Sequence, residues 1–106
     1  MLNKVYQVPY GTKDILPGEM KRRRKIENAI LDIFENWGYE EVKTPGFEYA
    51  DTFGSMVKDS DFRFFDRNNN LLVLRNDMTA PIARLAATRL QQEEGSKRLC
   101  YLANLY

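Results

Sequence analysis

The chain has 106 residues, a length that suits one small domain or part of a larger one. Hydrophobic residues make up 43% of it and aromatic residues 12%, which excludes wholesale disorder because enough apolar surface is present to bury a core. The 16 basic and 15 acidic side chains nearly cancel, so net charge gives no reason to expect a nucleic acid or an acidic membrane as partner.

A long amphipathic helix is predicted in the first third of the chain. Residues 1–13 read as an extended lead-in, because Pro9 disfavours helix at the preceding residue. Pro17 suits the first turn of a helix and Gly38 is a natural stop, so we expect the helix at about 16–37. Its apolar residues recur at helical spacing and form one stripe: Ile26, Ala29, Ile30, Ile33, Phe34 and Trp37.

The middle of the chain predicts strands. Residues 39–44 read as a strand that a proline ends, and residues 46–55 read as irregular. Two short apolar runs, 62–65 and 71–75, flank the sequence Asp-Arg-Asn-Asn-Asn, whose residues tolerate left-handed turns. We therefore expect a β-hairpin here.

A second helix and a final strand are predicted in the last third. The helix is expected at about 80–93, with Gly95 behind it. Residues 98–105 form a nearly continuous apolar run, typical of a strand covered on both faces. A buried strand next to Tyr106, without a turn or a partner, favours truncation of a larger fold. The order of helix, strand, hairpin, helix and strand indicates an α+β class.

Several kinds of chemistry are excluded by composition. The chain has no histidine and one cysteine, which rules out His-dependent triads, His-ligated zinc and a multi-thiolate metal site. No catalytic residue, metal or cofactor is predicted. Cys100 lies in an apolar run, where a small buried hydrophobe is favoured over a reactive thiol. No stretch approaches membrane-spanning length and no apolar signal core follows Met1, so the cytoplasm is the expected compartment.

The basic run Lys21–Lys25 has two interpretations. It could bind phosphate groups, or it could be the solvated face of the first helix. Five consecutive helical residues point around more than one full turn, so they cannot all meet one ligand. The solvated face is therefore favoured.

Asp77 and Thr79 stand at the mouth of the second helix. Both are ordinary helix-capping residues, which is the simpler interpretation. A carboxylate and a hydroxyl at a turn behind a buried strand could also bind the ammonium group of a small ligand. Arg75 could pair with a ligand carboxylate or phosphate, or it could be a buried strand end held by a structural partner such as Asp77. The residues alone leave both alternatives open.

Four segments, in order and spacing, resemble one protein family. Gly11–Pro17, which reads GTKDILP, is similar to the opening signature of histidyl-tRNA synthetases and of their paralogues, the regulatory subunits of short-form ATP phosphoribosyltransferase. Phe34–Glu48 resembles motif 1 of class II aminoacyl-tRNA synthetases, Leu74–Arg84 the histidine-pocket segment, and Arg98–Tyr106 the first strand of motif 2. The resemblance runs from about residue 8 to the end.

Departures within these segments favour the regulatory branch. The stretch between Phe53 and Phe62 is shorter than the insert of the synthetases, and the pocket segment reads Asp-Met-Thr where they have Glu-Gly-Thr. Asn76 stands where both branches usually have proline, from which we expect only a local effect on the rigidity of the turn. The motif 2 arginine would follow Tyr106 and is absent, as are the histidine-specific motifs and motif 3.

The resemblance implies the N-terminal part of a class II synthetase-like catalytic core, mainly an antiparallel sheet with flanking helices, over residues 1–106. It implies a non-catalytic regulatory subunit that partners the short catalytic subunit of ATP phosphoribosyltransferase in a hetero-oligomer and conveys feedback by histidine. Asp77 and Thr79 would contact the histidine α-amino group, with Arg75 in support. Motif 1, with Trp37, Tyr39 and Pro45, would form a dimer interface. The alternatives are a divergent histidyl-tRNA synthetase and a stand-alone dimerising fragment.

Overall fold

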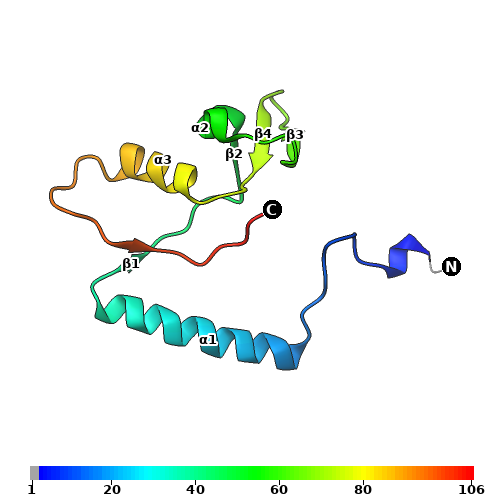
Figure 1. Cartoon of the computed structure of the whole chain (residues 1–106), viewed down its shortest axis with the longest axis horizontal. Coiled ribbons are helices and arrows are strands. Elements are labelled where there is room, and N and C mark those ends of the chain that lie inside the picture. The colour runs from blue at the N-terminus through cyan, green and yellow to red at the C-terminus, as the bar shows by residue number, and fades with distance from the viewer. Residues whose placement is uncertain (1–2) are drawn as a thin grey trace. The chain divides into compact units, whose positions relative to one another are not determined.

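The computed structural model describes residues 3–106, and Met1 and Leu2, which the predicted lead-in includes, lie outside the described residues. The chain divides into two compact units, one that ends at Gly38 and one that runs from Tyr39 to Tyr106. The helices and strands follow the order α1, β1, β2, α2, β3, β4, α3, β5 (Figure 1). The predicted mixture of helices and strands is therefore present.

Helix α1 spans Pro17–Asn36, so the predicted helix is confirmed. Pro17 occupies its first turn, and Gly38 beyond its end has a φ of 81°, a left-handed conformation that glycine adopts without a Cβ penalty. The apolar stripe is present but open: Ile26 is 60% exposed and Ile33 is 59% exposed. None of the described residues of α1 is buried.

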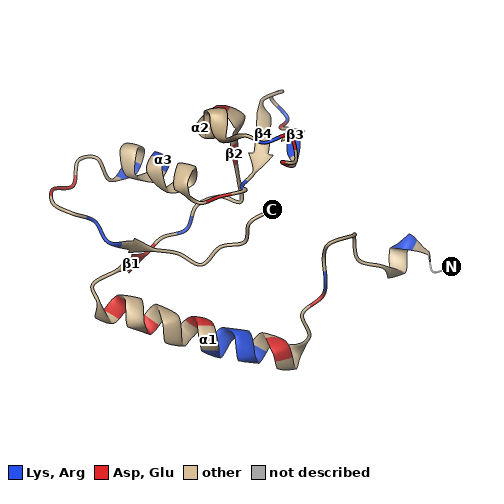
Figure 2. Cartoon of the chain, viewed as in Figure 1, with Lys and Arg blue, Asp and Glu red and all other residues tan. Residues whose placement is uncertain are grey.

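The basic run of α1 forms part of a surface of mixed charge (Figure 2). Arg23 Nη2 lies 3.3 Å from Glu19 Oε1, one helical turn earlier, and Arg24 Nη1 lies 3.2 Å from Glu27 Oε2. Such pairs on a helix surface stabilise it only slightly. Two of the five basic side chains thus have acidic neighbours on the same helix, as the solvated-face interpretation expects.

The lead-in contains one short turn that the sequence did not indicate. Lys4–Tyr6 form a 3-10 turn, where an extended chain was expected. The side chain of Asn3 explains it, because Oδ1 accepts a hydrogen bond of 3.2 Å from the amide of Val5 and caps the turn.

A three-stranded antiparallel sheet forms the centre of the second unit, with strand order β2-β4-β3. Strands β3 (Arg63–Phe65) and β4 (Leu71–Leu74) make the predicted hairpin. The turn between them has Asn69 at a φ of 62°, in the left-handed region expected of this asparagine-rich sequence. The hairpin prediction is confirmed.

The expectation of an irregular stretch over 46–55 was wrong. Strand β2 (Phe47–Tyr49) pairs with β4 from Phe47 opposite Leu74 to Tyr49 opposite Leu72, and helix α2 (Ala50–Phe53) and a 3-10 turn follow it. A run of three strand residues carries little local signal. Its hydrogen-bond partner lies more than twenty residues away in the sequence, so the pairing is a tertiary effect.

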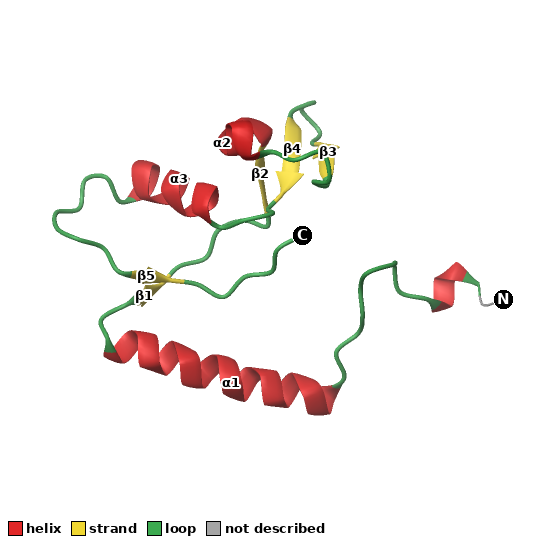
Figure 3. Cartoon of the chain, in the orientation of Figure 1, coloured by secondary structure: helices red, strands yellow, loops and turns green. Residues whose placement is uncertain are grey.

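Two predicted strands are much shorter than expected. Strand β1 is Glu40–Glu41 and strand β5 is Leu99–Cys100, and they pair in parallel as a separate two-stranded sheet (Figure 3). Residues 101–106 are exposed and are not a strand covered on both faces, so that prediction was wrong. Within the described chain, β5 has a neighbouring strand on one side, and the apolar run beyond Cys100 contacts the end of β4 through Arg75, which donates to the Asn104 carbonyl and accepts from the Tyr106 amide, without forming a strand.

The core lies where β4, α2 and α3 meet. Helix α3 spans Thr79–Arg89 and ends before the predicted residue 93, because a polar turn with a hydrogen bond from the Glu93 amide to the Leu90 carbonyl follows it. Phe53 from α2, Val73 from β4 and Ala80 from α3 pack together and are almost fully buried. Cys100 is also buried and free, as the structural interpretation of this residue expects. No helix among residues 3–106 is long and apolar enough to cross a membrane.

Candidate functional site

The turn between β4 and α3 carries the predicted ligand residues. Strand β4 is anchored by Val73, which is completely buried, and the chain leaves it through Arg75 and Asn76. Asp77 Oδ1 then accepts two hydrogen bonds from Thr79, one of 2.8 Å from its amide and one of 3.0 Å from its hydroxyl. The structure therefore brings the two predicted contact residues together at the start of α3.

This geometry keeps Asp77 charged. The hydrogen bonds from the Thr79 amide and then the Thr79 hydroxyl lower the pKa of Asp77 below its ordinary value, because both donors favour the carboxylate. The side chains of Asp77 and Thr79 remain exposed. Asp77 accepts the first amide of α3, but the N-cap residue itself is Met78, whose side chain forms no capping bond, so the capping interpretation of Asp77 and Thr79 holds only in part. A carboxylate has about four acceptor positions, so the same group can still receive a ligand ammonium.

Arg75 is a buried structural cation. Its Nε donates to the carbonyl of Asn104 at 2.7 Å, and its Nη1 donates to the carbonyls of Thr44 and Pro45 at 3.2 and 3.0 Å. Of the two alternatives left open for Arg75, the bonds agree with the buried strand end held by structural partners, but these partners are backbone carbonyls and not Asp77. These bonds join the end of β4 to two other segments of the unit. Arg75 can thus support the turn without touching a ligand.

Two side-chain pairs of the site were not predicted from the sequence. Glu48 on β2 and Arg84 on α3 form an ion pair with Nε 3.0 Å from both carboxylate oxygens and Nη2 2.9 Å from Oε1. Asp61 Oδ2 accepts a 2.7 Å hydrogen bond from Asn76. Neither pair has a sequence signal, because the partners are 36 and 15 residues apart. Both connect the segment around the turn to other elements.

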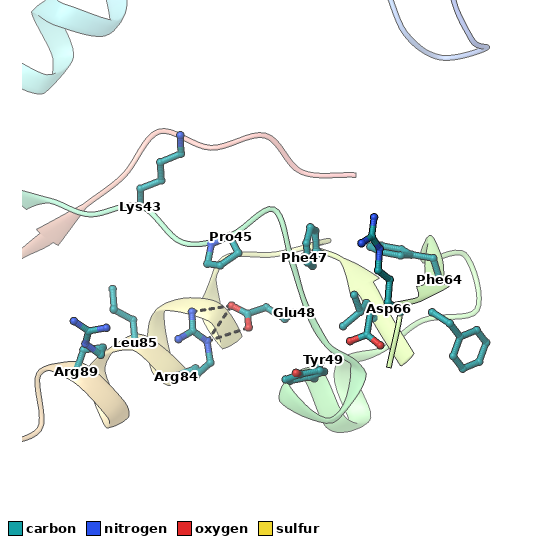
Figure 4. Close-up of a pocket in the computed structure, with 13 residues that line it drawn as sticks. Lys43, Pro45, Phe47, Glu48, Tyr49, Phe64, Asp66, Arg84, Leu85 and Arg89 are labelled. Atoms are coloured by element: carbon teal, nitrogen blue, oxygen red, sulfur yellow. Dashed lines mark hydrogen bonds and ion pairs between the residues drawn. The ribbon is translucent and has the colours of Figure 1, made fainter. Parts of the chain in front are cut away.

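An open hollow lies over the sheet beside α3, with a volume of about 800 Å³ (Figure 4). Its apolar wall includes Phe47 and Phe64, whose rings meet edge to face with centroids 5.4 Å apart. The Glu48–Arg84 ion pair, which joins β2 to α3, also lines the hollow. Asp77 and Thr79 do not line this hollow, so the predicted ligand turn and the hollow are different places.

The residues expected in a dimer interface are accessible. Trp37, just after α1, is 71% exposed, and Tyr39, just before β1, is 36% exposed. Pro45 is exposed as well, although its carbonyl accepts from Arg75. Within residues 3–106 there is no group of three or more His, Cys, Asp or Glu side chains that could hold a metal ion.

Comparison with known proteins identifies relatives over nearly the whole chain. Residues 11–106 match the family described as Histidyl-tRNA synthetase. A protein of Moorella thermoacetica named ATP phosphoribosyltransferase regulatory subunit is 44% identical over 98% of this chain, and the match covers 28% of that protein.

Solved structures agree with these sequence matches. One from Bacillus halodurans C, described as an ATP phosphoribosyltransferase regulatory subunit/histidyl-tRNA synthetase, superposes with a TM-score of 0.86 at 38% identity, over 95% of this chain and 27% of that one. The apo histidyl-tRNA synthetase of S. aureus superposes with a TM-score of 0.78 at 31% identity, over 90% of this chain and 24% of that one. The chain therefore spans only about a quarter of the length of the proteins that it matches.

Proposed function

The chain belongs to the histidyl-tRNA synthetase family, and from that premise we propose that it is the N-terminal portion of a regulatory subunit of ATP phosphoribosyltransferase. The fold predicted from the sequence, that of the class II synthetase catalytic core, is confirmed by the superpositions on family members. The observation that carries the proposal is the high sequence identity to a relative that has this name. A relative 44% identical over 98% of this chain bears the regulatory-subunit name.

In this function the protein performs no catalysis itself. It pairs with a short catalytic subunit in a hetero-oligomer in the cytoplasm, and the complex carries out the first step of histidine biosynthesis, the transfer of a phosphoribosyl group to ATP. Histidine acts as the effector. The coupling is allosteric, because a ligand that binds two states of the complex unequally shifts the balance between them.

Histidine is proposed to bind at the turn that carries Asp77 and Thr79. The support is chemical: an exposed carboxylate with a lowered pKa stays charged and forms a charge-assisted hydrogen bond with the α-ammonium group. The Thr79 hydroxyl, 3.0 Å from Asp77 Oδ1, is held beside it. Arg75 acts in support, because its bonds to three carbonyls fix the backbone that leads into the turn.

Self-association is proposed to use motif 1. Trp37 supplies a large exposed aromatic surface, and the exposed apolar stripe of α1 precedes it. Large aromatic side chains that are accessible in one chain are the usual anchors of protein interfaces. Tyr39 and Pro45 belong to the same motif and are also accessible.

Reconstitution tests the proposal. The complete gene product is mixed with a short catalytic subunit, and formation of phosphoribosyl-ATP from ATP and phosphoribosyl pyrophosphate is followed. The proposal predicts activity that needs both chains and that falls when histidine is added. Activity of the catalytic subunit alone that the second chain does not change contradicts it.

A matched pair of variants tests the histidine site. Asp77→Ala is expected to weaken inhibition by histidine, because it removes the carboxylate. Asp51→Ala removes an exposed carboxylate from helix α2, outside the turn, and is expected to leave inhibition unchanged. Unchanged inhibition in Asp77→Ala contradicts the assignment of the pocket.

The second candidate function is a divergent histidyl-tRNA synthetase. The family description and the 31% identity to the S. aureus synthetase favour it. It predicts exchange of pyrophosphate into ATP that depends on histidine and occurs without a partner chain. A stand-alone dimerising fragment is the remaining alternative, and a 106-residue protein that is monodisperse and melts cooperatively would support it.

A further inference from the structure

The segment that follows α2 forms a closed loop of its own. The carbonyl of Lys58 accepts a 3.1 Å hydrogen bond from the amide of Asp61, and the amide of Lys58 donates to Asp61 Oδ2 at 2.7 Å. Arg63 Nη2 also donates to the Lys58 carbonyl at 2.9 Å. Val57, at the start of the loop, packs against the core. The loop is therefore held together by its own bonds and fixed at one end.

Asn76 joins this loop to the ligand turn. Its Nδ2 donates to Asp61 Oδ2 at 2.7 Å and lies 3.4 Å from the carbonyl of Met56. Both partners are acceptors, so the amide nitrogen must face them. Asn76 is directly followed by Asp77, which itself holds Thr79. One side chain thus connects the loop to the residues that are proposed to bind histidine.

The bond to Asp61 is strong for its kind. A donor that meets an ionised carboxylate forms a charge-assisted bond, and this one is short and only partly exposed. The hydrogen bond from the Lys58 amide, followed by desolvation that opposes it and by the hydrogen bond from Asn76, leaves the pKa of Asp61 below its ordinary value. Asp61 is therefore ionised near neutral pH and accepts from both segments at one oxygen.

The connection also places a cation beside the turn. Lys58 belongs to the loop, and its positive charge adds slightly to the lowering of the pKa of Asp77 that the two Thr79 donors dominate. A cation near Asp77 competes with a ligand ammonium for the same carboxylate. The position of the loop therefore matters for what Asp77 can bind.

We infer that Asn76 is a positioning residue that, through Asp61, sets the 56–61 loop against the Asp77–Thr79 turn and so tunes the affinity of that turn for the amino-acid effector. This inference rests on the proposed function for the identity of the effector. The connection between loop and turn rests on the hydrogen bonds alone. It also gives Asn76 a role beyond the rigidity of its own turn, to which the sequence analysis had limited it.

The test uses the complete gene product and has one readout that needs no ligand. Hydrogen exchange is measured at the amides of Lys58 and Thr79. Asp61→Ala alters the loop, and the inference predicts faster exchange at Thr79, on the far side of Asn76. Asn76→Ala is expected to raise exchange at both amides. Unchanged exchange at Thr79 in Asp61→Ala overturns the connection.

The second readout is the Kd for histidine. Asn76→Ala and Asp61→Ala are each expected to raise the Kd about fivefold, the size of one net hydrogen bond. The double variant should bind histidine no more weakly than the single variant that has the higher Kd. Asn68→Ala, in the β3–β4 turn, is the matched control and should leave the Kd unchanged. Additive effects of the two substitutions overturn the inference.

A reversed pair separates positioning from a general loss of structure. Asn76→Asp alone sets two carboxylates against each other and should weaken binding further. Adding Asp61→Asn removes the repulsion between the two carboxylates, and partial recovery of the affinity is expected, because the group at position 76 then faces the Met56 carbonyl as an acceptor and not as a donor. No recovery relative to Asn76→Asp, with a folded protein, overturns the inference. If the unsubstituted protein does not bind histidine, the proposed function fails, and the exchange readout still decides whether Asn76 connects loop and turn.

Discussion

The structures of the two units of this chain depend on different kinds of interaction. Up to Gly38 the chain is a lead-in and one long helix, and none of its described residues is buried. From Tyr39 on, short elements with few local signals bury Phe53, Val73 and Ala80 between them. Capping residues and periodicity define the first unit, whereas pairing between distant segments defines the second. The apolar stripe of α1 therefore needs a surface from elsewhere, while the second unit contains its own core.

The largest effect is expected in the core of the second unit. Phe53→Ala in the complete gene product should lower the free energy of unfolding by about 3–5 kcal/mol, because the side chain is 2% exposed and its loss leaves a cavity. Chemical denaturation measures it. The loss should not depend on protein concentration. A loss that grows with protein concentration would mean that this core, too, is completed by another chain.

The ion pair between β2 and α3 comes next. Arg84→Ala leaves the Glu48 carboxylate, whose side chain is 6% exposed, without its partner. A buried charge without compensation costs about 3 kcal/mol, again measured by denaturation. Arg89→Ala, an exposed arginine on the same helix, is the control and should change stability by less than about 0.5 kcal/mol. Equal effects of the two substitutions would show that the pair does not hold α3 to the sheet.

The buried cation at the end of β4 should have a smaller effect. Arg75→Met keeps an apolar stem but removes hydrogen bonds to three carbonyls, and we expect a loss of about 2 kcal/mol. Arg67→Met, in the exposed hairpin turn, is the matched control. If Arg75→Met also weakens histidine binding, the positioning of the turn is affected. If it weakens binding without any loss of stability, Arg75 is a direct ligand contact and its assignment here is wrong.

A substitution in the first unit should change self-association and not the packing of a core. Trp37→Ala is expected to raise the dissociation constant of the self-associated protein about tenfold, because it removes an exposed aromatic anchor. Its effect on stability should therefore be largest when the protein is concentrated enough to self-associate, and should vanish on dilution below the dissociation range. Analytical ultracentrifugation and denaturation at several concentrations measure both. A stability loss that is the same at every concentration would place Trp37 inside its own chain.

The smallest expected effect is electrostatic. The Thr79 donors lower the folded-state pKa of Asp77, so the stabilisation from its carboxylate is complete above the ordinary value of 3.8 and is lost as pH falls through the lower folded-state value. Asp77→Asn keeps an acceptor for the Thr79 amide but does not titrate. The difference in stability between the two proteins should therefore be constant above pH 3.8 and shrink below it. A difference that grows as pH falls contradicts the lowered pKa.

Much of the first unit and part of the second could be predicted from the sequence. Helix α1 was placed within one residue at each end, since Pro17, Gly38 and the apolar period act within the helix itself. The β3–β4 hairpin was predicted because its turn chemistry is local. The closeness of Asp77 and Thr79 also followed from their spacing at the start of a helix.

The remaining features depend on partners that are distant in the sequence. Strand β2 exists because β4 pairs with it, and the apolar run after Cys100 is not a strand because, in the described chain, the pairing with β1 ends at Cys100. The partners of Arg75, Glu48 and Asn76 lie between 15 and 36 residues away, where no periodicity or capping rule reaches. The sequence by itself determined the family, the first helix and the turn that brings Asp77 to Thr79, because each depends on neighbouring residues. Only the tertiary structure decided which side chains hold that turn in place, because hydrogen bonds between distant segments form only after the chain has folded.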